Sequence, residues 1–250
     1  MRIIITGASS GLGEALALHY ATKENQLVLL ARREDRLNDV AARCIAMGAK
    51  VETIIADVNN VDLMQNIGKQ LANTHIDRVI LNAGVSMGHS GGVTPFEDFH
   101  RLFQTNFLSL HALLESIIPK LIAQKSGEVV FISSLASLIS MPTSVAYSAS
   151  KRAMNAYAEG LRYQLKPYGI DVMTILPGFI DSEMTRKNRF KMPFLLSTEQ
   201  GVKRITNAIA AKKYFYPFPF RFYLMIRFVL LLPHSLRDKI IYFTNFKKGS

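Results

Sequence analysis

Residues 2–13 read R-I-I-I-T-G-A-S-S-G-L-G, an apolar run that passes directly into a turn of glycine and serine. The run Arg2–Thr6 predicts a buried strand, and Leu12–Tyr20 predicts the helix that follows it. Glycines let the backbone approach a ligand closely, and the N–H groups at a helix start favour an anion. We therefore expect a pyrophosphate-binding turn, although an ordinary tight turn has the same composition. Its residues are Gly7, Ser9, Ser10, Gly11, Leu12 and Gly13.

The rest of the chain alternates apolar, β-branched runs with segments of helical period. Further strands are expected at Gln26–Leu30, Val51–Ala56, Arg78–Leu81, Glu128–Ser133 and Ile170–Leu176, with a short aromatic strand, Tyr214–Tyr216, closing the sheet. Helices are expected at Glu34–Met47, Val61–Leu71, Phe96–Gln124 and Val145–Lys166, and a capping box at Ser197–Gln200 opens another. This order predicts an α/β fold, a doubly wound parallel sheet of the Rossmann type.

Nothing in the sequence divides the chain into two domains, and 250 residues fit one large α/β domain. We expect a dinucleotide-binding catalytic domain over 1–212, with a substrate lid at about 181–197, where the alternation breaks. A C-terminal extension over 213–250 is expected to pack on the same domain. The single cysteine, Cys44, excludes an intrachain disulfide, and the N-terminus lacks the pattern of a secretory signal. A cytoplasmic location is therefore expected.

The positive charge of the chain is confined to its last quarter. Residues 1–185 carry 16 Lys/Arg against 17 Asp/Glu, whereas residues 186–250 carry 14 against 2. Residues 214–246 are mostly apolar and aromatic, but Arg227 and Pro233 break them into runs too short to span a bilayer. Two interpretations stay open: peripheral contact at the inner face of a membrane, or packing over the pocket and between subunits of a homo-oligomer. Aliphatic residues outweigh the basic ones, which disfavours nucleic acid.

The strand ends expected on either side of the glycine turn carry further candidates for a dinucleotide site. Arg32 and Arg33 follow the second strand, where an acidic residue is usual for NAD, so we favour NADP, whose 2′-phosphate suits guanidinium groups. A solvated helix start with Glu34 and Asp35 as partners is the alternative. Other candidates lie after the third and fourth strands: Asp57, Val58, Asn82, Ala83 and Gly84.

Residues 147–151 read Y-S-A-S-K, which places a phenol and an ammonium group on one face of a helix. A free phenol has a pKa of about 10, and a nearby positive charge favours the phenolate, so Tyr147 beside Lys151 predicts a general acid and base. A simple surface pair has the same spacing. Ser133 and Ser134 follow the fifth strand; their side chains face opposite ways, so only one can meet a substrate.

In their order along the chain, T-G-A-S-S-G-L-G, D-V, N-A-G, Asn106, the serine, Y-x-x-x-K and P-G resemble the short-chain dehydrogenase/reductase family. The resemblance covers residues 1–182. It implies that Tyr147 is the acid and base, that Lys151 lowers the Tyr147 pKa and binds the nicotinamide ribose, that Ser134 holds the substrate oxygen and that Asn106 supports a proton relay. It also implies cofactor contacts from Tyr147, Lys151, Pro177, Gly178, Ile180 and Ser182, although Ser182 stands where the family often has threonine.

The expected activity is NADP(H)-dependent interconversion of a small carbonyl compound and its alcohol, with a hydrophobic substrate suggested by the apolar lid and C-terminus. The alternative is a protein of the same fold that binds nucleotide without catalysis, or a membrane-associated scaffold. The six histidines show no spacing typical of metal ligands, so no metal is expected.

Overall fold

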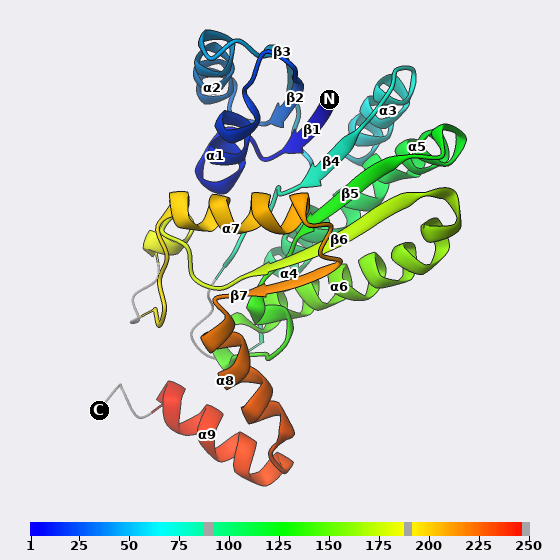
Figure 1. Cartoon of the computed structure of the whole chain (residues 1–250). Coiled ribbons are helices and arrows are strands. Elements are labelled where there is room, and N and C mark those ends of the chain that lie inside the picture. The colour runs from blue at the N-terminus through cyan, green and yellow to red at the C-terminus, as the bar shows by residue number, and fades with distance from the viewer. Residues whose placement is uncertain (88–92, 188–191, 247–250) are drawn as a thin grey trace.

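The computed structural model describes residues 1–87, 93–187 and 192–246, without the side chains of 244–246. Parts of the expected lid and extension, and His89, therefore lie outside the described residues. Seven parallel strands form one sheet in the order β3-β2-β1-β4-β5-β6-β7 (Figure 1). The strands are β1 (Arg2–Thr6), β2 (Gln26–Ala31), β3 (Lys50–Ile55), β4 (Arg78–Leu81), β5 (Gly127–Ile132), β6 (Ile170–Pro177) and β7 (Phe215–Phe218).

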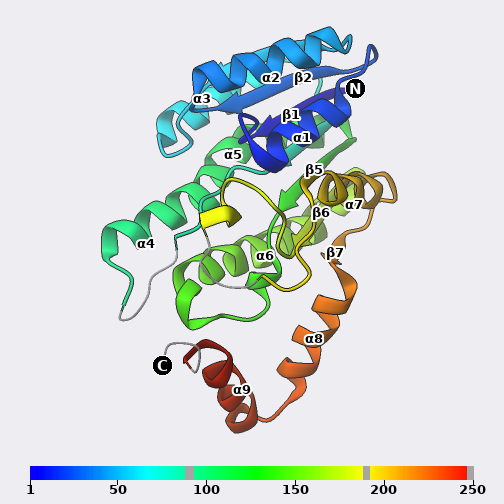
Figure 2. The same cartoon turned by 90° about the vertical axis from the view of Figure 1, so that its left-hand side faces the viewer.

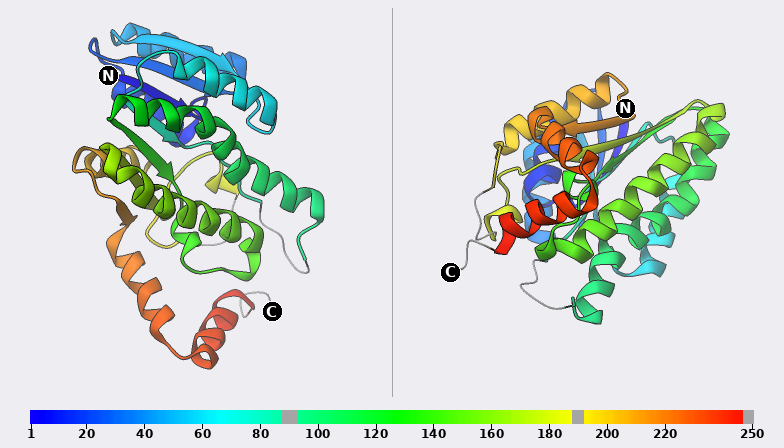
Figure 3. Two further views of the ribbon diagram at one scale, coloured as in Figure 1. Left: turned by 90° about the vertical axis from the view of Figure 1, so that its right-hand side faces the viewer. Right: turned by 90° about the horizontal axis from the view of Figure 1, so that it is seen from below.

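Helices cover both faces of this sheet (Figures 1 and 3). One face packs against α1 (Gly11–Tyr20), α2 (Glu34–Ala46) and α7 (Thr198–Ala210). The other packs against α3 (Val61–Ala72), α5 (Ser109–Gln124) and α6 (Val145–Leu165), with α4 (Phe96–Phe103) extending the line of α5. Figure 2 shows α4 and α5 in succession along one side of the molecule. The doubly wound α/β fold expected from the sequence is confirmed.

The central strands are mostly apolar because successive side chains enter different cores on the two faces of the sheet. In β1, Ile3 and Ile5 pack on the α1 side, whereas Ile4 packs on the α3 side. All three side chains are fully buried. The apolar run 3–5 is thus buried from solvent only in the interior of a sheet that is covered on both faces.

The strand order places a topological switch between β1 and β4. From β1 the chain moves outward through β2 to β3, and from β4 it moves the other way through β5 and β6 to β7. Open α/β sheets bind ligands at the carboxyl ends of the strands on either side of such a switch. The glycine turn 7–13 lies at this position, directly after β1.

The expected helix 96–124 is present, but a π-helical turn, Gln104–Leu108, separates α4 from α5. By length and composition this helix is the one candidate for a membrane span among the described residues. It packs as a core helix, however, because α5 buries Leu113, Leu114, Ile117 and Leu121 against the sheet and α3.

The last part of the chain adds one strand and two helices. The aromatic strand is confirmed, although it spans Phe215–Phe218 rather than 214–216, and it pairs with the end of β6. The capping box is also confirmed: Ser197 and Gln200 each accept a hydrogen bond from the other's backbone N–H. Beyond β7, α8 (Phe220–Leu231) and α9 (His234–Phe246) extend away from the sheet as a hairpin, hereafter the α8–α9 hairpin (Figures 1 and 2).

Candidate active site

The hydroxyl groups of Ser134 and Tyr147 meet at the carboxyl end of the sheet. Ser134 comes two residues after the end of β5, and Tyr147 lies in the first turn of α6. Their side chains are hydrogen-bonded to each other. Two hydroxyl donors held side by side can bind one oxygen atom of a substrate and deliver a proton to it.

The acidity of Tyr147 differs from the expectation. Burial raises the pKa of Tyr147, and the hydrogen bond with Ser134 lowers it by a smaller amount. Lys151, which the sequence predicts would lower this pKa, donates from Nζ to the carbonyl oxygen of Ile132 at 2.9 Å. The lysine is bound to the backbone of β5, while the phenol lies where desolvation favours its neutral form, so the effect of Lys151 on the Tyr147 pKa stays a prediction.

Lys151 is the most deeply buried cation of the site. Its side chain is 4% exposed, and burial lowers the pKa of its ammonium group from 10.5 to about 8. A Cβ atom added at Gly84 would lie 3.4 Å from Lys151 Nζ and 3.3 Å from Asn106 Oδ1. The glycine of the N-A-G segment therefore makes room for the lysine and asparagine side chains.

The two adjacent serines have different roles, as the alternation of side chains requires. Ser133 Oγ is buried and donates to Asn155 Oδ1 at 2.6 Å, so it faces the body of α6. Ser134 Oγ accepts from the N–H of Ala136 at 3.1 Å and interacts with Tyr147. Of the two, Ser134 is the one placed to meet a substrate.

Asn106 is fully buried within the π-helical turn and clamps the loop after β4. Its Oδ1 accepts from the N–H of Val85 at 2.8 Å, and its Nδ2 donates to the carbonyl oxygen of Val85 at 3.0 Å. Nδ2 also donates to Ser150 Oγ at 3.1 Å, and Ser150 Oγ donates to the carbonyl oxygen of Tyr147 at 2.8 Å. The asparagine thus joins the loop after β4 to the first turn of α6.

The glycine turn is packed tightly against the end of β4. Gly7 has φ +70°, and a Cβ atom there would lie 2.9 Å from Ala83 Cα. At Gly13 a Cβ atom would lie 2.1 Å from the carbonyl oxygen of Gly7. Thr6 Oγ1 accepts from the N–H groups of both Asn82 and Ala83 at 3.0 Å. These two glycines are therefore required by the packing of the turn itself.

Gly11 is the glycine of the turn that leaves space beside it. It has φ +57°, and the nearest atom to an added Cβ would be Ser182 Cβ at 3.6 Å. Ser10, the N-cap of α1, makes no side-chain cap to the helix. The start of α1 thus offers its backbone donors and an open approach, which fits a dinucleotide pyrophosphate.

Arg33 reaches over this turn from the end of β2. It donates to the hydroxyl oxygens of Ser9 and Ser10, and to Glu183 Oε2 at 2.9 Å. Arg36 donates to the same carboxylate oxygen at 3.0 Å, and these contacts, that with Arg33 foremost, lower the pKa of Glu183. Arg32, in contrast, is largely exposed and contacts Asp57 at 3.4 Å. The two arginines expected to act together therefore lie in different surroundings.

The segment after β6 lies beside the loop that carries Ser134 and beside the glycine turn. The N–H of Gly178 donates to the carbonyl oxygen of Phe218 at 2.7 Å, and a Cβ atom at Gly178 would lie 3.3 Å from Leu135 Cδ1. Ile180 is 3% exposed and pairs with Leu196 in an isolated parallel bridge. Ser182, which faces Gly11, exchanges hydrogen bonds with Thr185.

The remaining predicted residues lie along the same edge of the sheet. Asp57 accepts from the backbone and side chain of Asn59 at 3.0 and 2.8 Å, and Val58 is half-buried beside it. No group of His, Cys, Asp and Glu able to hold a metal ion occurs within 1–87, 93–187 and 192–246.

Sequence reasoning missed the residues that position the catalytic groups. Asn155 joins Ser133 to Ser137, and Arg152 donates to the carbonyl oxygens of Ser137 and Leu138 at 2.9 and 2.8 Å. Together they fix the loop that carries Ser134. The signal for Asn155 was available, because it follows Tyr147 and Lys151 at the same spacing of four on one face of α6. Glu183 gave no such signal, since its arginine partners are about 150 residues away.

Comparison with known proteins identifies the family of the chain. The family model described as short chain dehydrogenase matches residues 1–192. An uncharacterized oxidoreductase of Myxococcus xanthus is 33% identical over 237 residues, which cover 94% of each chain.

Solved structures agree on the fold. A short-chain dehydrogenase from Sphingobium yanoikuyae in complex with NADPH superposes with a TM-score of 0.82 at 24% identity, covering 100% of this chain and 97% of that one. A short chain dehydrogenase/reductase from Burkholderia phymatum in complex with NAD gives 0.81 at 22% identity, covering 90% and 91%. The chain belongs to the short-chain dehydrogenase/reductase family and is an oxidoreductase.

Proposed function

We propose that the protein is an NADP(H)-dependent oxidoreductase that interconverts an apolar carbonyl compound and its alcohol. The observation that carries this proposal is the hydrogen-bonded pair of Ser134 and Tyr147 beside the buried Lys151, at the carboxyl end of the sheet. Ser134 follows β5, and Tyr147 and Lys151 lie on α6, so all three groups come from the half of the chain that begins at β4.

In the reductive direction, the bound nicotinamide supplies a hydride to the carbonyl carbon. Tyr147 donates its proton to the carbonyl oxygen, and the raised pKa keeps that proton on the phenol at neutral pH. Ser134 Oγ donates a hydrogen bond to the same oxygen and orients it. Lys151 binds the nicotinamide ribose, and Asn106 supports the relay that returns a proton to Tyr147. The carbonyl carbon thus gains the hydride and its oxygen the proton.

The dinucleotide would lie along the carboxyl edge of the sheet. The turn 7–13 holds the pyrophosphate, Asp57 and Val58 border the adenine, and the backbone of 82–84 lies against the ribose. Pro177, Gly178, Ile180 and Ser182 border the nicotinamide. A Cβ atom added at Gly11 would lie 3.6 Å from Ser182 Cβ, and this closeness supports the arrangement because it brings the two walls of the expected site together.

Arg33 is the basis of the NADP preference. A 2′-phosphate is an anion with several acceptor oxygens, and Arg33 already binds one carboxylate and two hydroxyl groups at the turn. The phosphate takes the place of the Glu183 carboxylate in this cluster. Arg36, which shares Glu183, is a second cation for the same phosphate.

An apolar substrate is supported by the aromatic surroundings of the segment after β6. Phe222 stacks on Phe179, with ring centroids 5.9 Å apart, and lies at a tilt to Phe194, with ring centroids 5.8 Å apart. Phe179 directly follows Gly178, and Phe194 belongs to the proposed lid of about 181–197. Aromatic and aliphatic side chains thus gather next to the position of the reacting groups.

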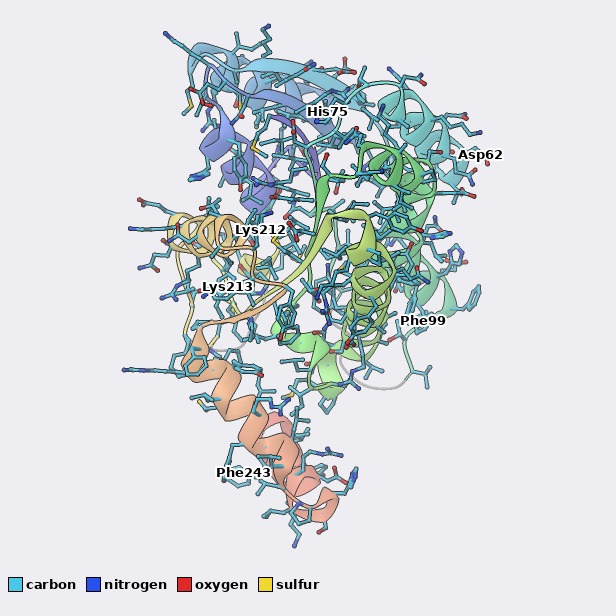
Figure 4. The ribbon with its side chains drawn as sticks, turned by 45° about the vertical axis from the view of Figure 1, so that its right-hand side comes forward. Asp62, His75, Phe99, Lys212, Lys213 and Phe243 are labelled. Atoms are coloured by element: carbon cyan, nitrogen blue, oxygen red, sulfur yellow. The ribbon has the colours of Figure 1, made fainter. Side chains whose placement is uncertain are left out.

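Three further proposals concern the whole chain. We divide it into a catalytic domain, 1–212, and an extension, 213–250, whose α8 packs on the domain through Ile226. A homo-oligomer is supported by α4, where Phe96 is 79% and Phe99 39% exposed, and Figure 4 shows Phe99 at the surface. A cytoplasmic location is supported by the buried, unpaired Cys44.

The test of the proposed function is a direct comparison of cofactors. Initial rates are measured with NADPH or NADH and a panel of aldehydes and ketones of increasing chain length, together with the melting temperature at each cofactor concentration. We expect NADPH to stabilise the fold at lower concentration than NADH and to be consumed with the apolar compounds. Stronger stabilisation by NADH than by NADPH would contradict the cofactor preference. Binding of NADPH with no turnover of any compound would contradict the proposed activity.

A further inference from the structure

The α8–α9 hairpin is amphipathic in a way that the catalytic site does not explain. On α8, Ile226 is buried, and Phe222, Tyr223 and Leu230 pack around it against Leu135 and Leu176. The opposite face of the same helix carries large apolar side chains in open solvent. They are Phe220, Leu224, Phe228 and Leu231, with exposed fractions of 62%, 49%, 65% and 77%. Their spacing of four, four and three residues makes one continuous stripe.

Basic residues flank this stripe, and acidic residues are missing from the helix. Arg221 and Arg227 are exposed on either side of it, and among the described residues neither has an acidic partner. The sequence 214–246 has Arg237 and Lys239 in addition, against the single acid Asp238. A helix with an exposed apolar stripe bordered by arginines is typical of helices that lie in the surface of an anionic bilayer.

The second helix also exposes apolar side chains. On α9, Leu236 and Phe243 are 46% and 60% exposed and lie seven residues apart on one face, with the exposed Lys239 between them. Figure 4 shows Phe243 at the end of the molecule opposite Asp62 and His75. The hairpin extends beyond the rest of the chain in Figures 1 and 2 and in the left view of Figure 3, so a flat surface can approach its end.

We propose that the outer face of the α8–α9 hairpin docks on an anionic lipid bilayer, with the stripe on α8 at the acyl boundary and the arginines at the headgroups. A second copy of the chain fits this face less well. A two-fold contact through α8 would bring Arg221 and Arg227 against the same residues of the other copy, with no carboxylate on either helix. Lipid phosphates supply the negative charge that α8 lacks.

Docking in this orientation also bears on the substrate, and this step rests on the proposed function. The inner face of α8 contacts Leu135, the residue after Ser134. On the same helix, Phe222 stacks on Phe179 and packs at a tilt against Phe194. The helix that rests on lipid is therefore the one that borders the catalytic segments. An apolar carbonyl compound dissolved in the bilayer would reach Tyr147 along α8 without entering bulk water.

The test is flotation of the full chain with vesicles of phosphatidylcholine alone or with 30% phosphatidylglycerol, at low and high salt. We expect flotation with the anionic vesicles that salt weakens. R221Q/R227Q should bind them roughly 30-fold more weakly, since each basic residue near an anionic surface contributes about fivefold. F220S/L224S/F228S should lose binding to both vesicles. The control I45S/M47S, which alters exposed side chains of α2, should float like the wild type.

Two outcomes overturn the docking proposal. One is equal flotation of the wild type and the α8 variants. The other is conversion of a dimer to a monomer by F220S/L224S/F228S without any wild-type flotation, which would make the stripe an interface between copies. Reduction of a water-soluble aldehyde should be unchanged in these variants, while reduction of a long-chain aldehyde in anionic vesicles should fall at least tenfold. Flotation without any reductase activity would leave the docking intact and refute only the proposed function.

Discussion

At the scale of single residues, the chemistry depends on which hydroxyl group faces the substrate. Ser133 and Ser134 are neighbours, but Ser133 binds Asn155 within the fold and Ser134 binds Tyr147. They therefore form a matched pair of mutations. Ser134→Ala should lower kcat roughly 100-fold, because it removes a donor to the substrate oxygen. Ser133→Ala should keep kcat within about threefold of the wild-type value and should lower the unfolding free energy by about 1 kcal/mol. Steady-state kinetics and urea denaturation of both variants test this difference. Equal losses of kcat in the two variants would contradict the assignment of Ser134 as the serine that meets the substrate.

The cofactor preference also rests on particular side chains. Glu183→Gln should tighten NADPH binding roughly fivefold and leave NADH unchanged, because it removes a carboxylate that competes with the 2′-phosphate for Arg33. Arg33→Ala should weaken NADPH roughly 100-fold, while Arg32→Ala, which alters an exposed neighbour, should change it by less than about threefold. Titration by protein fluorescence or calorimetry measures the NADPH and NADH affinities of all three variants. An unchanged NADPH affinity in Arg33→Ala would refute the role of Arg33.

Lys151 makes stability depend on pH, because its pKa is lowered from 10.5 to about 8 on folding. Between these values the unfolded chain binds more protons at this site than the folded chain, so the unfolding free energy rises with pH. The Lys151→Met variant lacks this group. The unfolding free energy of the variant minus that of the wild type should therefore be about 3 kcal/mol more positive at pH 7 than at pH 10.5. Denaturation of both proteins across this range tests the sign, and a difference independent of pH would contradict the buried, depressed lysine.

At the scale of elements, the π-helical turn is the device that brings α5 to the catalytic residues. It presents Asn106 to the backbone of Val85, whose N–H and carbonyl groups both bind the side chain. Asn106→Ala leaves those two groups without a partner, so we expect a loss of about 2 kcal/mol of unfolding free energy. Asn106→Asp, which keeps the acceptor for the N–H, should lose less. Thermal denaturation distinguishes them, and a stable alanine variant would show that the clamp is unimportant.

At the scale of the whole molecule, the sequence determined the sheet better than the site. Strand Arg78–Leu81 was predicted to the residue, because the apolar run Val79–Leu81 is typical of a strand buried on both faces. The π-helical turn was not predicted, since the apolar period of 96–124 continues through it. The partners of Arg33 and the backbone bond of Lys151 depend on contacts between distant segments, which no local pattern encodes.

The most direct test of the central claim is the rate of NADPH oxidation by Tyr147→Phe with the best carbonyl substrate at saturating concentration. The variant loses one hydroxyl group, so NADPH should still raise its melting temperature as it does for the wild type. We expect kcat to fall by roughly 10²–10⁴, the contribution of a general acid. A variant that binds NADPH and keeps the wild-type kcat would show that the proton comes from another group.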